Sequence, residues 1–277
     1  MNSCMSTLSI AEQEQKAETF YAEANYAEAL KRYEALISQW NQNNVREENP
    51  YFDPAGHAAF SMGQKDKAQE FFSQSMHYGT ASAETYTRLI DHYREIDNFS
   101  REMMTIEGLL ERYPHEPAAQ KAKERLFVMY VETARWEEAE AKWQQMDIEP
   151  DKAMLEHYLK VCRQLNNSTK GNETARLLLA MESGNVPALE WRALQYYNKA
   201  EARYTAEQEA YERNKTRRQY AQLLEGYEAA GADYRKARDI YERLFRNNPE
   251  PRYARYLFNI YARFQDKEKA EYYRSRM

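Results

Sequence analysis

Glycine, proline and cysteine are scarce in this sequence, and each scarcity argues against a class of fold. Only eight glycines and eight prolines occur in 277 residues, whereas all-β folds and glycine-rich nucleotide-binding folds need more turn residues. The two cysteines, Cys4 and Cys162, form no CxxC pair or Cys/His cluster. A disulfide framework and a structural zinc site are therefore not expected, and the composition favours an all-helical protein.

Long hydrophobic runs and targeting signals are missing as well. No stretch approaches the roughly 18 apolar residues that a membrane-spanning helix needs. Residues 1–8 contain neither a basic region nor an apolar region of the kind that begins a signal peptide. We therefore expect a cytoplasmic protein without a membrane span, or a periplasmic or exported one if a leader has been removed.

Motifs for catalysis and cofactor binding are absent from the sequence. It has no GxxxxGK(S/T) or GxGxxG loop, no HExxH pair and no GxSxG turn. Cys162 falls on an apolar helix face, which favours a buried small hydrophobe over a nucleophile. We expect no cofactor, no metal and no enzymatic activity. The alternative is an enzyme whose site no motif reveals.

Charge is distributed unevenly along the chain. The formal net charge is −5, which disfavours a nucleic-acid partner. Residues 1–150 carry 15 Lys and Arg against 26 Asp and Glu, while residues 151–277 carry 24 against 18. An acidic first half and a mildly basic second half would allow molecules to associate head to tail.

A repeated pattern of small and aromatic residues runs through much of the chain. Its clearest unit is AETFYAEANYAEALKRYEAL at residues 17–36. Here Ala29 allows two antiparallel helices to approach closely, and Tyr33 and Leu36 continue an apolar stripe at helical spacing. The same position in the first four units is occupied by Ala29, Ala68, Glu102 and Ala139, which are separated by 39, 34 and 37 residues. Glu102 is the one residue of these four that is not small.

This pattern resembles the tetratricopeptide repeat (TPR), a helix–turn–helix unit of about 34 residues. The resemblance implies an all-α, TPR-like α-solenoid of antiparallel helix pairs. Residues 1–150 and the end of 188–277 fit it best, and the last helix is expected at Lys267–Arg276. Most of the 23 tyrosines are then expected in the core, although aromatics could also stack on nucleic-acid bases.

The middle of the chain fits the repeat poorly. Residues 151–187 resemble a degenerate helix pair with a loop at 166–172, and 183–187 are the expected boundary before the third region. Residues 188–230 contain no proline, which predicts one or two long helices with a break near Asn214. The extra residues of the first repeat are expected in the loop Asn41–Pro50.

The resemblance also implies a binding surface. In the TPR family, the first helix of each pair lines a concave groove that holds a peptide or a partner helix. An acidic groove would favour a basic or amphipathic protein segment, although charged helix faces are often merely solvated. The leading interpretation is a non-enzymatic adaptor, and the rival is a structural protein that assembles into dimers or filaments. Register places these residues in the groove: Glu14, Glu18, Tyr21, Asp53, His57, Phe60, Glu84, Asp91, Arg94 and Glu95.

Overall fold

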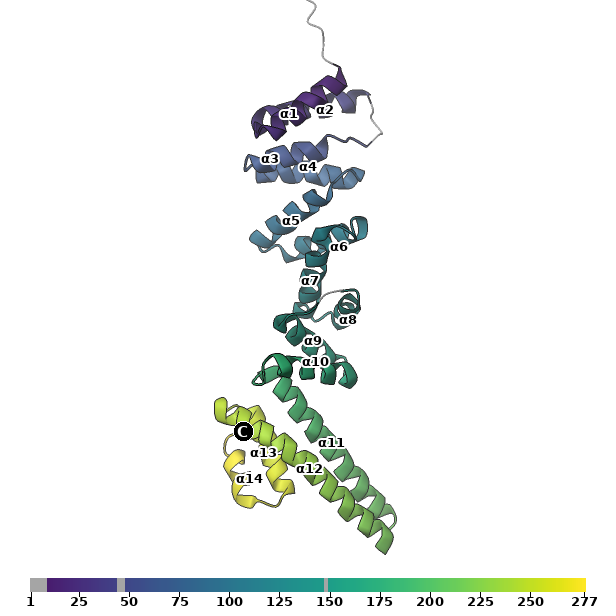
Figure 1. The fold of residues 1–277 in the computed structure, drawn as a ribbon, viewed down its shortest axis with the longest axis vertical. Helices are drawn as coiled ribbons and strands as arrows, with labels where there is room; N and C mark the ends of the chain where they lie inside the picture. The colour runs from purple at the N-terminus through teal and green to yellow at the C-terminus, as the bar shows by residue number, and fades with distance from the viewer. Residues whose placement is uncertain (1–8, 44–47, 147–148) are drawn as a thin grey trace, which may run out of the picture. The chain divides into compact units, whose positions relative to one another are not determined.

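The computed structural model describes residues 9–43, 48–146 and 149–277. These residues form 14 helices and no strand (Figure 1), which confirms the all-α prediction. None of the helices is both long enough and apolar enough to cross a membrane. Cys4, the start of the chain and residues 44–47 of the expected Asn41–Pro50 loop lie outside the described residues.

The chain divides into two compact units, an N-terminal unit of residues 1–129 and a C-terminal unit of residues 130–277. The N-terminal unit contains α1 (Ile10–Ala22), α2 (Tyr26–Asn43), α3 (Phe52–Ser61), α4 (Lys65–Tyr78), α5 (Ala83–Glu95), α6 (Phe99–Arg112) and most of α7 (Pro117–Glu132). The C-terminal unit contains α8 (Trp136–Gln144), α9 (Lys152–Gln164), α10 (Ser168–Met181), α11 (Val186–Arg213), α12 (Arg217–Asn247), α13 (Pro251–Arg263) and α14 (Lys267–Arg274).

Six helix pairs are joined by the same backbone turn. In each turn one residue has a positive φ, and the N–H of the next residue donates to a carbonyl five residues earlier, as Asn98 does to Tyr93 at 2.8 Å. This is the hydrogen bond of a Schellman turn, which ends a helix with a left-handed residue. Only one of the six left-handed residues is glycine: Ala24 (58°), Gly63 (76°), Asp97 (52°), Ala134 (57°), Asn166 (53°) and Gln265 (60°).

The small-residue position lies five residues after each left-handed residue, and it is buried in every pair. A small side chain is needed there because the helices touch: a Cβ on Gly171 would lie 2.1 Å from the ring of Trp191. The six residues at this position are Ala29, Ala68, Glu102, Ala139, Gly171 and Ala270. The repeat is therefore defined by close helix contact as much as by its spacing along the sequence.

The pair formed by α9 and α10 is more regular than the sequence indicated. The expected loop at 166–172 is wrong, because α10 already begins at Ser168. The Asn167 side chain accepts a hydrogen bond from the N–H of Lys170 at 3.2 Å, which caps the helix at that point. With Asn166 in the left-handed turn and Gly171 at the small position, this pair has the same geometry as the others.

The long helices α11 and α12 pack side by side as an antiparallel hairpin (Figure 1). The break expected near Asn214 is confirmed, since α11 ends at Arg213. The long helices extend beyond residue 230, where they were expected to end, because α12 continues to Asn247. Within the hairpin, Gly226 allows the two backbones to approach, because a Cβ there would lie 2.3 Å from Cγ of Glu207.

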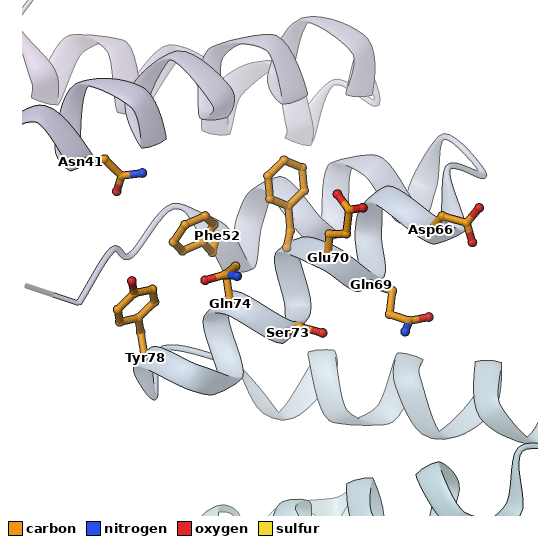
Figure 2. A pocket seen from close by; sticks show the side chains of 9 residues that line it. Asn41, Phe52, Asp66, Gln69, Glu70, Ser73, Gln74 and Tyr78 are labelled. Carbon is orange, nitrogen blue, oxygen red and sulfur yellow. The ribbon is translucent and has the colours of Figure 1, made fainter. Parts of the chain in front are cut away.

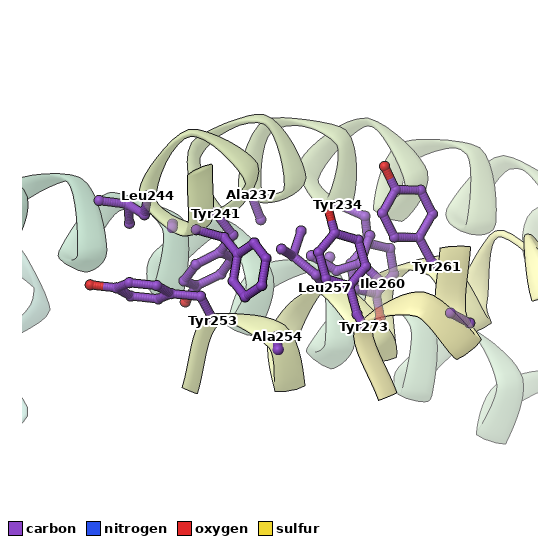
Figure 3. Close-up of a cluster of buried hydrophobic side chains, with 14 of the residues drawn as sticks. Tyr234, Ala237, Tyr241, Leu244, Tyr253, Ala254, Leu257, Ile260, Tyr261 and Tyr273 are labelled. Carbon is purple, nitrogen blue, oxygen red and sulfur yellow. The ribbon is translucent and has the colours of Figure 1, made fainter. Parts of the chain in front are cut away.

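The core of the C-terminal repeats is rich in tyrosine (Figure 3). Tyr234 and Tyr241 of α12 pack with Tyr253 and Tyr261 of α13, and Tyr273 of α14 closes the cluster. These five side chains are all buried. Eleven of the 23 tyrosines are buried in all, so core packing accounts for about half of them and not for most of them as expected. The last helix is slightly shorter than expected and ends at Arg274 instead of Arg276.

Candidate functional site

Two acidic residues and a tyrosine form the beginning of the predicted groove. Glu14, Glu18 and Tyr21 share one face of α1 by their i, i+4, i+7 spacing. Neither carboxylate forms an ion pair within the described residues. Burial and the carboxylates of Glu18 and Glu14 raise the pKa of Tyr33 to about 12, so the two acids lie around the edge of the α1/α2 core.

Asp53 and His57, also predicted to line the groove, are buried in a polar cluster. Asp53 accepts hydrogen bonds from the Thr85 hydroxyl at 2.5 Å and from the Ser82 N–H at 3.2 Å. The His57 Nε2 atom lies 3.4 Å from Asp53. Burial would raise the pKa of Asp53, but hydrogen bonds from His57 and Thr85 outweigh it and hold the pKa below its usual value. The cluster joins α3 to the start of α5.

This cluster does not have the geometry of a Ser–His–Asp triad. Ser82 Oγ lies 3.2 Å from His57 Nε2, and Asp53 approaches the same nitrogen. A triad needs the hydroxyl on one ring nitrogen and the carboxylate on the other, so that the carboxylate orients the base. The other nitrogen, Nδ1, is buried without a hydrogen-bond partner. These contacts hold two helices together and do not activate Ser82.

The acids that α5 contributes to the predicted groove are paired with cations. The ring of Phe60 also lies on this face, 5.0 Å beneath the Arg88 guanidinium. These ion pairs compensate much of the negative charge that was expected on this face from the repeat register. The pairs are Glu84 with Arg88 (2.7 Å), Asp91 with Arg94 (3.7 Å) and Glu95 with Lys65 (2.6 Å).

A cavity of about 770 Å³ lies between the end of α2 and the length of α4 (Figure 2). Asp66 and Glu70 line it one helical turn apart, and neither forms an ion pair within the described residues. Phe52 and Tyr78 stack with ring centroids 5.8 Å apart. The complete lining contains no Lys or Arg: Asn41, Phe52, Asp66, Gln69, Glu70, Phe71, Ser73, Gln74 and Tyr78.

None of the ten predicted groove residues lines this α2/α4 cavity. Sequence reasoning missed it because the resemblance directed attention to the first helix of each pair, whereas α4 is a second helix. A signal was present: Asp66, Gln69, Glu70, Ser73 and Gln74 recur at helical spacing on one face of a helix whose other face is apolar.

Cys162 has no nucleophilic character in this fold. Its side chain is fully buried, and burial raises the pKa of its thiol to about 11. The thiolate is the reactive form of cysteine, so the prediction of a buried small hydrophobe is confirmed. Across the described part of the chain, no group of three His, Cys, Asp or Glu residues could hold a metal ion.

Comparisons with known proteins found similar structures but no matching sequence. No family model matches the sequence, and no curated protein matches it. A TPR protein from Parabacteroides merdae is 13% identical over 95% of this chain and 90% of its own, with a TM-score of 0.42. The C-terminal part of a TPR protein from Cytophaga hutchinsonii is 11% identical over 95% and 93%, with a TM-score of 0.47. A TPR protein from Bacteroides fragilis is 14% identical over 98% and 100%, with a TM-score of 0.34.

The described residues have a TPR-like fold by their own geometry. Six successive helix–turn–helix units share a left-handed turn, and each has a buried position five residues after the left-handed residue that is small in five of the six.

Proposed function

We propose that this protein is a helical-repeat scaffold whose N-terminal unit binds a basic, amphipathic protein segment. The α2/α4 cavity is the observation that carries the proposal. It combines two carboxylates, Asp66 and Glu70, with aromatic rings, and no cation lines it. An amphipathic segment with Lys or Arg on one side and apolar residues on the other matches that combination.

The physical basis has two parts. The carboxylates of Asp66 and Glu70 attract a basic segment from solution and then accept charge-assisted hydrogen bonds from it. The rings of Phe52, Phe71 and Tyr78 offer apolar surface, which supplies most of the affinity when it is covered. Neither part requires a conformational change in the repeat, since the helices already hold these side chains along the cavity.

The groove predicted from register offers a second acidic surface on the same unit. Glu14 and Glu18 are the members of that set whose charge is uncompensated. Asp53 and His57 are held in the buried cluster, and Glu84, Asp91 and Glu95 are paired. We therefore assign the α2/α4 cavity as the primary site and Glu14 and Glu18 as the next candidate.

Fluorescence anisotropy with matched peptides tests the proposal. Three labelled amphipathic peptides share the same apolar residues and carry Lys, Gln or Glu at their polar positions. We expect the Lys peptide to bind at least about tenfold more tightly than the Glu peptide. Asp66→Lys combined with Glu70→Lys should remove that preference, because it reverses the charge of the cavity.

Two further double variants locate the site. Glu14→Lys with Glu18→Lys tests the predicted groove, and Glu111→Lys with Glu116→Lys is a control with the same change in net charge at exposed positions outside both surfaces. Equal affinity for all three peptides would refute the proposal. An equal loss in all three double variants would mean that overall charge, and no particular site, controls binding.

A further inference from the structure

The C-terminal unit contains a cavity of about 510 Å³ between α10 and α11 whose charged lining is entirely cationic. Arg176 comes from α10, and Arg192 and Lys199 come from α11. No Asp or Glu is among the residues that line it. The α10/α11 cavity is therefore opposite in charge to the α2/α4 cavity.

Close packing between the two helices gives this cavity a fixed frame. Gly171 allows α10 to contact the ring of Trp191, which is buried. The Trp191 indole N–H donates a hydrogen bond of 2.9 Å to the side-chain oxygen of Asn172. This bond turns the amide oxygen of Asn172 toward Trp191, and the NH₂ group of the same side chain keeps its two donors.

The two arginines are not neutralised by neighbouring acids. Arg176 and Arg192 form no ion pair with any described residue. Lys199 does have a counter-ion, since Asp233 lies 3.0 Å from its ammonium group. Two guanidinium groups with unused donors therefore face a space lined by a third cation, an arrangement that stabilises a bound anion.

Tyr196 adds an aromatic surface to the cation cluster. Its hydroxyl lies 3.4 Å from Arg192 Nη2, and its ring lies 5.2 Å from the ammonium group of Lys236. Lys236 is held by Asp233 at 3.6 Å. Leu179 of α10 adds an apolar side chain to the lining. The cavity can thus contact both an anionic group and the carbon skeleton that bears it.

We propose that the α10/α11 cavity binds a phosphate monoester. Such a group carries up to two negative charges and three acceptor oxygens at neutral pH, because its second pKa is about 6. Arg176 and Arg192 would each bind it through paired N–H donors, and Asn172 would donate through its amide. Lys199, whose charge Asp233 partly compensates, would add a further N–H donor. A single carboxylate would leave one arginine without a counter-charge.

Isothermal titration calorimetry with the full-length chain tests this proposal. The probes are inorganic phosphate, a small sugar phosphate, a phosphoserine peptide and the same peptide without phosphate. We expect all three phosphate-bearing probes to bind and the unphosphorylated peptide not to bind. Comparing the sugar phosphate with the phosphopeptide shows whether the natural source is a small molecule or a protein.

Arg176→Ala is the most informative variant because no described residue contacts that side chain through an ion pair or hydrogen bond, so its loss leaves the fold intact. It should weaken phosphate binding at least about tenfold, as should Arg192→Gln. Arg255→Ala removes an exposed cation of α13 and should leave binding unchanged. Lowering the pH to about 5, where the monoester is singly charged, should also weaken phosphate binding by the wild-type chain.

Three results would overturn the assignment. These are no phosphate binding by the wild-type chain, equal weakening by Arg255→Ala and Arg176→Ala, or acetate binding as tight as phosphate binding. Circular dichroism of each variant establishes that a change in affinity is not a loss of helix.

Discussion

Glu102 occupies a position where the other five helix pairs have alanine or glycine, and its surroundings explain the difference. Its side chain is only 2% exposed, yet it accepts hydrogen bonds from Arg94 of α5 and Arg125 of α7, each at 2.9 Å. One carboxylate thereby connects three consecutive helices. Burial would raise the pKa of Glu102, but the hydrogen bonds from Arg125 and Arg94 outweigh it and lower that pKa.

Replacing Glu102 with glutamine should destabilise the protein in a pH-dependent way. At neutral pH the expected loss is about 1–2 kcal/mol of unfolding free energy, discounted because Arg94 is half exposed. The folded-state pKa is depressed, so the stabilisation is present above the unfolded value of about 4.3 and is lost as pH falls through the folded pKa. Urea unfolding at several pH values measures this. A difference between Glu102→Gln and wild type that does not shrink as the pH falls below the unfolded value of about 4.3 would contradict the ion-pair account.

Asp53 and His57 show what the repeat register can predict about a side chain and what it cannot. Their spacing predicted that they share a face of α3, and both do take part in one cluster. Spacing could not indicate that Ser82 and Thr85, which come almost a whole repeat later, would lie against the same face of α3. There they form hydrogen bonds with Asp53 and His57. Availability for a ligand depends on these long-range contacts.

At the scale of elements, apolar periodicity predicted helices well and turns less well. The break near Asn214 was visible because polar and charged residues interrupt the apolar stripe there. The left-handed turns were not visible as a class, since alanine, aspartate, asparagine and glutamine occupy positions where glycine would be the usual signal. Tertiary packing of the two helices holds these residues in a conformation that they rarely adopt alone.

The distal part of the α11/α12 hairpin should open more readily than the rest of the two helices. Beyond Tyr204 and Tyr227, whose ring centroids lie 4.2 Å apart, no other helix of the C-terminal unit lies beside it (Figure 1). Within residues 205–229 only Leu223 and Gly226 are buried. Local unfolding free energy follows buried contact, so few contacts resist opening here.

Hydrogen–deuterium exchange with mass spectrometry measures this difference. Peptides from residues 205–229 should exchange at least about tenfold faster than peptides from 232–247, where α12 contributes Tyr234 and Tyr241 to the core. Uniform protection along the whole of α12 would mean that something else covers the hairpin, such as a second copy of the chain.

At the scale of the whole molecule, the charge asymmetry is the feature most open to test. Residues 1–150 are strongly acidic and residues 151–277 are mildly basic. We expect weak head-to-tail association at low ionic strength, with an average mass above the 32.9 kDa of one chain. Added salt should restore the monomer mass, because screening shortens the Debye length to about 3 Å at 1 M.

Multi-angle light scattering across a salt series provides the measurement. A mass of 32.9 kDa at low salt and high concentration would exclude self-association and leave the scaffold function alone. A mass above that value that does not change with salt would indicate an apolar interface instead.

The sequence by itself determined the all-helical class, the recurrence of helix pairs and the presence of long helices broken near Asn214, because these follow from local periodicity and from the absence of breakers. It also determined the polarity of charge. It did not determine that α12 continues to Asn247. Only the tertiary structure decided which charges remain free. Glu14, Glu18, Asp66 and Glu70 keep theirs, whereas Asp53 is compensated within its cluster. Whether a carboxylate is paired depends on residues that are distant in sequence and become neighbours only when the helices pack. The scarcity of glycine and proline could therefore predict the helices, but it could not predict the surfaces that the helices present.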